Sequence, residues 1–168
     1  MFQKDDYVFY ESEGICLVTD ILRSPLDGMP QDRDYYLLRS IYSKNSVLYV
    51  PVDNDKIYMR AILKKEEAEK LVNEIPRLEE ICEKDAKKLR ATYVELLESH
   101  LPSNWVRILK TVRARLQSSI AKGQRISDTE RNVAESAKRF LHSELALALN
   151  LEENEVEDYI RARLGDPA

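Results

Sequence analysis

The sequence predicts an α+β protein, with a small β-barrel at the N-terminus followed by a compact all-helical domain. Five short segments rich in Val, Ile, Leu and Tyr, separated by turn-forming residues, occupy the first 62 residues. From residue 64 the apolar residues recur with a helical period instead. A chain of 168 residues, 43% hydrophobic, suits one medium domain or two small ones. We therefore expect two domains, 1–62 and 63–168.

The predicted strands are short apolar segments, and turn-forming residues separate them. They cover 7–10, 15–22, 34–42, 46–52 and 56–62. The separating turns are Glu13-Gly14, the Pro- and Gly-containing loop 24–30, Lys44-Asn45 and Asp53-Asn54. Five short strands with tight connections are typical of a strongly bent barrel of the SH3 or Tudor type.

The second half contains five predicted helices with recognisable ends. They cover 64–75, 77–99, 104–121, 127–149 and 150–163. Pro76 ends the first helix, and a His-Leu-Pro-Ser break separates the second from the third. Ser127 and Glu130 have the spacing of a capping box at the start of the fourth helix. Asn150 with Glu153 is expected to start the last one.

The composition excludes several classes of protein. Cys16 and Cys82 are the only cysteines and lie far apart in the sequence, so we expect neither a disulfide framework nor a cysteine-based zinc site. The expected compartment of the protein is a reducing cytosol. No apolar run approaches the roughly 18–20 residues of a membrane span. The first residues contain no apolar stretch that could serve as a signal peptide. A formal net charge of −4 argues against a general nucleic-acid coat protein.

Few residues in the chain could form a catalytic or metal site. His100 lies at a helix break and His142 inside a helix, and neither has a second histidine at ligand spacing. The sequence contains neither the phosphate-binding loop G-x-x-x-x-G-K nor the dinucleotide-binding motif G-x-G-x-x-G. The carboxylates follow helix surfaces, as at Glu66, Glu67 and Glu69. We expect no catalytic, cofactor or metal site, and an enzyme would require convergent His or carboxylate groups.

The most informative electrostatic feature is the segment 105–125, which carries six basic residues and no acidic one. They are Arg107, Lys110, Arg113, Arg115, Lys122 and Arg125. On a helical wheel the apolar side chains form one face, which consists of Ile108, Leu109, Val112, Leu116 and Ile120. The remaining arc is cationic. It is either an ordinary solvated face or a surface that contacts nucleic-acid phosphates.

Trp105 is the only tryptophan and stands directly behind Asn104 at the start of this basic helix. On the wheel it falls in the middle of the apolar face, which predicts a core residue. An apolar side chain at a helix start could instead wedge into a minor groove or stack on a base. Both interpretations remain open from the sequence.

The strand at 46–52 has apolar residues on both faces. Val47, Tyr49 and Pro51 alternate with Leu48, Val50 and Val52 along it. A proline suits an edge strand, where its missing N–H is not needed for a ladder. Such an edge could pair with a strand of another protein. The alternative is burial against the helical half of the chain.

These elements appear in the order found in one bacterial protein family. The segments that carry the resemblance are Asp6-Tyr7-Val8-Phe9-Tyr10, Gly14-Ile15-Cys16, Tyr35-Tyr36-Leu37-Leu38-Arg39, Val50-Pro51-Val52-Asp53-Asn54, Lys65-Glu66-Glu67-Ala68, Asn104-Trp105-Val106-Arg107 and Ser143-Glu144-Leu145-Ala146-Leu147-Ala148-Leu149. Their order over nearly the whole chain resembles the CarD/CdnL-type bacterial transcription factors (the CarD_CdnL_TRCF family), in particular their Firmicutes-like branch.

The resemblance implies a non-enzymatic transcription factor in two parts. A Tudor-like N-terminal domain would bind the β subunit of RNA polymerase through the strand Val47, Leu48, Tyr49, Val50 and Pro51. A helical domain would contact promoter DNA weakly, mainly through phosphates, and stabilise the open complex. The DNA-contacting residues would be Trp105, Arg107, Lys110, Arg113, Arg115, Lys122 and Arg125.

The same resemblance leaves some properties open. The protein would be cytoplasmic, associated with the nucleoid through RNA polymerase, and either a monomer or a strand-exchanged dimer. The alternative function is an adaptor that binds polymerase without touching DNA.

Overall fold

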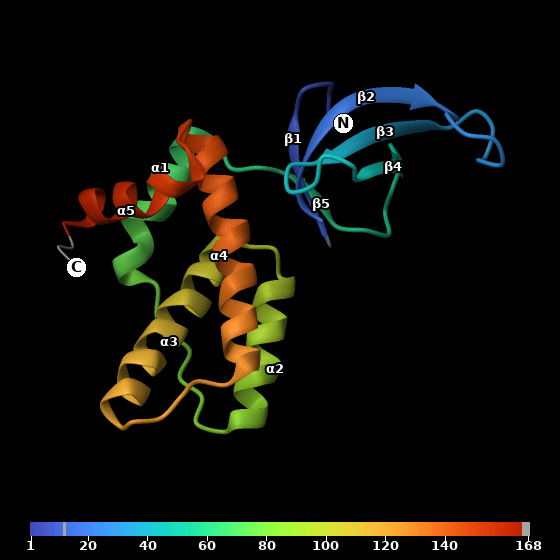
Figure 1. Cartoon of the computed structure of the whole chain (residues 1–168). Helices are drawn as coiled ribbons and strands as arrows, with labels where there is room; N and C mark the ends of the chain where they lie inside the picture. The colour runs from blue at the N-terminus through green and yellow to red at the C-terminus, as the bar shows by residue number, and fades with distance from the viewer. Residues whose placement is uncertain (12, 166–168) are drawn as a thin grey trace. The chain divides into compact units, whose positions relative to one another are not determined.

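A computed structural model describes residues 1–11 and 13–165. Over these residues the chain is α+β, as the sequence predicts, with one antiparallel sheet followed by five α-helices and two short 3-10 helices (Figure 1). The chain forms two compact units, one from Met1 to Ile62 and the other from Leu63 onwards. None of the helices in the described part of the chain is long and apolar enough to cross a membrane.

The first unit is a five-stranded sheet in the order β4-β3-β2-β1-β5. The strands are β1 (Tyr7–Tyr10), β2 (Gly14–Arg23), β3 (Asp34–Ser40), β4 (Val47–Pro51) and β5 (Met59–Ala61). Each predicted strand is present, and β4 and β5 lie at opposite edges, so the strongly bent barrel that the sequence predicts is a sheet that does not close. The long strand β2 shifts register against β3 between Val18 and Asp20, a bulge that bends the sheet.

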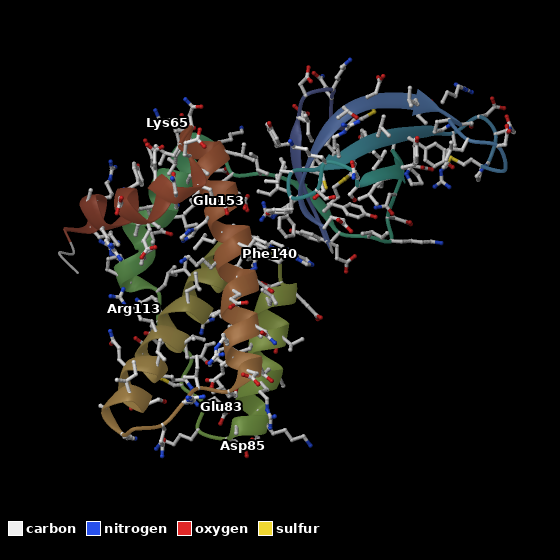
Figure 2. The ribbon with its side chains drawn as sticks, viewed as in Figure 1. Lys65, Glu83, Asp85, Arg113, Phe140 and Glu153 are labelled. Carbon is white, nitrogen blue, oxygen red and sulfur yellow. The ribbon has the colours of Figure 1, made fainter. Side chains whose placement is uncertain are left out.

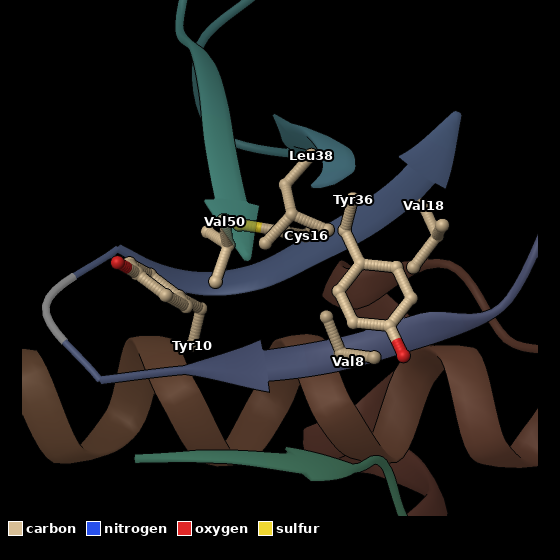
Figure 3. Close-up of a cluster of buried hydrophobic side chains, with 7 residues drawn as sticks. All are labelled: Val8, Tyr10, Cys16, Val18, Tyr36, Leu38 and Val50. Atoms are coloured by element: carbon tan, nitrogen blue, oxygen red, sulfur yellow. The ribbon is translucent and has the colours of Figure 1, made fainter. Parts of the chain in front are cut away.

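One cluster of buried hydrophobic side chains in the first unit lies on one face of the sheet (Figure 3). It consists of Val8, Tyr10, Cys16, Val18, Tyr36, Leu38 and Val50. These residues stand opposite one another in the ladders, as in the pairs Val8 with Cys16 and Tyr36 with Val50. Because side chains alternate across a strand, this register places the whole set on one face.

The second unit is built from helices whose ends are defined by specific residues. They are α1 (Lys65–Glu74), α2 (Ala86–Glu98), α3 (Pro102–Ala121), α4 (Asp128–Leu149) and α5 (Val156–Leu164), with 3-10 turns at Ile75–Arg77 and Glu153–Glu155. The helices α2, α3 and α4 pack against one another, and α1 packs on α4 and α5 (Figure 1). The core of this unit includes the fully buried Tyr93, Trp105, Ile108 and Leu145.

The capping predictions succeed at one end of α4 and fail at the other. Ser127 is the N-cap and forms the expected capping box with Glu130. Asn150, predicted to start the last helix, is instead the C-cap of α4, with a φ of 55°. Asparagine tolerates this left-handed conformation better than most residues, which suits it to end a helix. The chain then continues through the second 3-10 turn into α5.

The prediction of a helix over 77–99 is wrong for its first third. Segment 78–85 contains neither helix nor strand, and α2 begins only after Asp85. The Asp85 carboxylate accepts a hydrogen bond from the Lys88 N–H at 2.9 Å, which caps the helix at that point. Earlier in the segment, the Ile81 N–H donates to Thr111 Oγ1 of α3 at 2.8 Å. Contacts with α3 therefore satisfy backbone groups that a helix would otherwise have paired.

Candidate functional site

Strand β4 forms one edge of the sheet. It pairs with β3 along one side, from Val47 opposite Arg39 to Pro51 opposite Tyr35. Its other side pairs with no strand of the described chain. Unpaired N–H and C=O groups on such an edge can accept a strand from a partner.

The side chains of β4 alternate in burial. Leu48 and Val50 pack on the sheet core, with Val50 buried and Leu48 half-buried. Val47 is 40% exposed, and Tyr49 and Pro51 are half-buried. The structure thus brings the five residues predicted to bind polymerase onto one edge strand, where three of them, Val47, Tyr49 and Pro51, alternate with the two core residues.

Two of the predicted DNA-contacting residues bind backbone inside the helical unit. Arg107 Nε–H donates to the Glu79 carbonyl at 3.0 Å. Lys110 Nζ donates to the Ile75 carbonyl at 2.9 Å and to the Leu78 carbonyl at 2.6 Å. Both side chains are half-buried against the 75–79 stretch. The structure therefore gives their positive charges an internal partner, the carbonyl groups of the 3-10 turn and the start of segment 78–85.

A third predicted residue, Arg115, forms an ion pair with Glu130 of α4. The Glu130 side chain is only 6% exposed and also accepts a hydrogen bond from the Tyr93 hydroxyl at 3.2 Å. Burial by itself raises the pKa of Glu130, but Arg115, Ser127 and Tyr93 outweigh it and hold that pKa below its ordinary value. Burial also raises the pKa of Tyr93, which keeps its hydroxyl a donor. The basic segment lacks acids in the sequence but meets one in space.

The remaining three basic residues of the predicted set lie on the exposed surface. Arg113 is exposed on α3, Lys122 is the C-cap of that helix, and Arg125 lies in the connection to α4. Gly123, between the last two, has a φ of 68°, the left-handed conformation that ends a helix and favours glycine. Lys122 and Arg125 form no ion pair among the described residues. Lys122 and Arg125 therefore remain available to an external anion.

Trp105 belongs to the core of the helical unit. It is 0% exposed, and its indole N–H donates to the Leu97 carbonyl at 3.2 Å. Its ring centroid lies 5.5 Å from that of Phe140, which Figure 2 labels on α4. Of the two interpretations of Trp105, the structure supports core packing, because a wedge would have to leave these contacts.

The predicted apolar face of α3 is only partly buried. Ile108 and Val112 lie in the core, whereas Leu116 is 40% exposed and Ile120 is 67% exposed. The C-terminal half of α3 thus carries an apolar face that its own unit leaves largely uncovered, beside Lys122 and Arg125.

The described residues contain no group of three His, Cys, Asp or Glu side chains that could hold a metal ion. His142 is half-buried, and burial together with Lys138 lowers its pKa. A neutral imidazole inside a helix of the bundle is consistent with a packing role.

Comparison with known families matches both units. Residues 2–63 match the CarD-like/TRCF RID domain, and residues 104–161 match the CarD C-terminal domain. The chain belongs to the CarD family. No curated protein matches it. CarD-family domains are those of non-enzymatic transcription factors that interact with RNA polymerase, and the RID domain is Tudor-like.

The two matches divide this CarD-family chain in an informative way. The first covers the whole sheet, including β4, and the second runs from α3 into α5. Helices α1 and α2, with segment 78–85 between them, lie outside both matches. Sequence reasoning missed two residues of the helical unit, the exposed Arg90 of α2 and the buried Glu130 of α4. Only the capping-box spacing singled out Glu130, and no local signal singled out Arg90.

Proposed function

We propose that this CarD-family transcription factor docks on the β subunit of RNA polymerase through the edge strand β4 and stabilises open promoter complexes. The observation that carries the proposal is the position of β4. It is an unpaired edge inside the domain that matches the polymerase-interacting family, with Val47 exposed and Tyr49 half-buried along it. Docking would add a strand of the β subunit to this edge, with main-chain hydrogen bonds for affinity and alternate side chains for specificity.

The DNA contact in this proposal rests on the cationic end of α3. Lys122 and Arg125 can reach phosphates without giving up contacts in the core, whereas Arg107 and Lys110 hold backbone carbonyls. A weak contact suffices, because a module tethered to polymerase meets the promoter at an effective concentration of about 1 mM. A dissociation constant of about 10⁻⁴ M, typical of non-specific phosphate contacts, would then be adequate. The protein would act in the cytoplasm, at the nucleoid, as a monomer or a strand-exchanged dimer.

The test of docking compares the full-length chain with two charge-introducing variants. Tyr49→Glu places a carboxylate on the β4 edge, and Tyr58→Glu places one on an exposed residue beside β5 as the matched control. We expect micromolar binding of the wild type to the isolated N-terminal lobe of a β subunit, a loss of at least about tenfold for Tyr49→Glu, and no change for Tyr58→Glu. Equal affinities of the two variants, or no binding at about 100 µM, would refute docking through β4.

A second candidate is an adaptor that binds polymerase without contacting DNA. The internal contacts of Arg107, Lys110 and Arg115 favour it, because they remove half of the predicted basic side chains from the DNA-facing set. The double variant Lys122→Glu/Arg125→Glu separates the two functions in a promoter-melting assay with polymerase. The DNA-contact function predicts shorter-lived open complexes with unchanged β-lobe binding, and the adaptor function predicts no change in either measurement.

A further inference from the structure

A cavity of about 340 Å³ lies at the end of the helical unit where α2 and α4 begin. Figure 2 labels Asp85, the N-cap of α2, at this end. The lining residues are Ala86, Leu89, Arg90, Arg115, Arg125, Ser127 and Glu130. Three arginines and one carboxylate therefore face one space, and its volume is within the range of small-ligand sites.

The only acid that lines the cavity is already fully engaged. Glu130 pairs with Arg115 and accepts hydrogen bonds from Tyr93 and from the backbone N–H and hydroxyl of Ser127. It can offset the charge of Arg115 but has no lone pair directed at a further cation. The nearby Asp85 carboxylate caps the Lys88 N–H and does not line the cavity.

The other two arginines have no acidic partner among the described residues. Arg90 donates only to the Ala86 carbonyl of its own helix, at 3.4 Å, and no hydrogen bond or ion pair is formed by Arg125 in the part of the chain that the structure describes. The cavity thus holds three positive charges against one negative charge. The first turn of the 22-residue helix α4 adds the positive end of its dipole.

This geometry points to a phosphate-binding site. We infer that the cavity binds a phosphate group between Arg90 and Arg125, with Arg115 held at its edge by Glu130. Planar guanidinium groups donate two parallel hydrogen bonds to a phosphate, which a point charge such as lysine cannot do. The phosphate belongs either to the DNA backbone or to a free polyphosphate. Binding of a DNA phosphate would depend on the proposed function, whereas binding of a free polyphosphate would not.

The site is a property of this chain and not of the matched family segments alone. Arg90 lies in α2, outside both family matches, whereas Arg115, Arg125 and Glu130 lie inside the second one. A bound phosphate would link α2, α3 and the α3–α4 connection, and so would stabilise the folded helical unit by mass action.

The test uses the full-length chain and inorganic pyrophosphate as the probe. Thermal unfolding, followed by the fluorescence of the single tryptophan Trp105, is measured with increasing pyrophosphate against NaCl of equal ionic strength. The variants are Arg90→Gln and Arg125→Gln, and the matched control is Arg131→Gln, an exposed arginine of α4 outside the cavity. We expect stabilisation of wild type and control, with about tenfold weaker apparent binding for each cavity variant.

A second arm identifies the source of the phosphate. The same four proteins are titrated with a short DNA duplex. If both cavity variants lose DNA binding, the site belongs to the DNA backbone. This assignment holds whether pyrophosphate competes with the duplex for the wild-type protein or does not bind it at all. Pyrophosphate binding that depends on Arg90 and Arg125, with DNA binding unchanged, assigns it to a free phosphate ligand. If neither probe distinguishes the cavity variants from Arg131→Gln, the inference is wrong. Failure of β-lobe binding would refute the docking proposal and leave this result unaffected.

Discussion

The carboxylate of Glu130 joins three helices, and its removal is expected to destabilise the helical unit markedly. The substitution Glu130→Gln keeps the shape of the side chain and removes its charge. In the wild-type protein the Glu130 carboxylate accepts hydrogen bonds from Arg115 of α3, from Tyr93 of α2 and from Ser127 at the start of α4. A glutamine has one acceptor oxygen and one NH₂ group, which only donates hydrogen bonds. The NH₂ group of the variant would therefore face a donor group that the wild-type carboxylate binds.

The magnitude follows from these contacts. Weakening the charge-assisted bond from Arg115 costs about 1.5–2 kcal/mol, at the lower end of the range because that arginine is half exposed. Disrupting the capping box with Ser127 adds about 0.5–1 kcal/mol. We therefore expect a loss of about 2–3 kcal/mol in the free energy of unfolding, which corresponds to a fall in Tm of roughly 10 °C for a unit of this size.

The assay is urea unfolding of the full-length chain, monitored by circular dichroism at 222 nm and by tryptophan fluorescence, which reports the helical unit. The matched control is Glu135→Gln, an exposed position on the same helix. Its effect should stay within about 0.5 kcal/mol. A Glu130→Gln variant as stable as Glu135→Gln would show that the three-helix contact contributes nothing measurable, and the reasoning would be refuted.

Three further predictions concern protonation, exposure and thiol chemistry. Because folding lowers the pKa of Glu130, its contribution to the free energy of unfolding is present above about pH 4.5 and is lost as the pH falls through the folded pKa. The wild-type protein should therefore lose this contribution when it is titrated with acid, whereas Glu130→Gln should not. Ile120→Lys should change the unfolding free energy by less than about 0.5 kcal/mol, whereas Ile108→Ala should cost about 2–4 kcal/mol, measured by the same urea titrations. The exposed Cys82 should react with a thiol reagent in the native protein, whereas Cys16, buried and with its pKa raised to about 12, should react only after unfolding; two equally fast thiols would contradict this.

The sheet could be predicted well from the sequence because its signals are local. Alternation and turn residues fix each strand, and all five strands form where they are expected. Whether the barrel closes could not be predicted, because it depends on a contact between β4 and β5, which follow one another in the chain but lie at opposite edges of the sheet. No local pattern reports such a contact.

The helical unit shows the limit more clearly. Segment 78–85 has the composition of a helix, but it is not helical, and Thr111 and Lys110 of α3 bind its backbone. Helix propensity is a weak preference that tertiary hydrogen bonds can override. The pairing of Arg115 with Glu130 was equally out of reach, because it depends on how α3 packs against α4. The capping box was predictable, since all of its atoms lie within four consecutive residues.

The internal use of Arg107 and Lys110 also has an evolutionary consequence. Because these side chains hold the carbonyls of Glu79, Ile75 and Leu78, selection for a stable fold alone would retain basic residues at both positions. A descendant that lost all contact with nucleic acid would keep them as long as it kept the non-helical stretch before α2. Drift would first remove the charges that support no backbone, at Lys122 and Arg125.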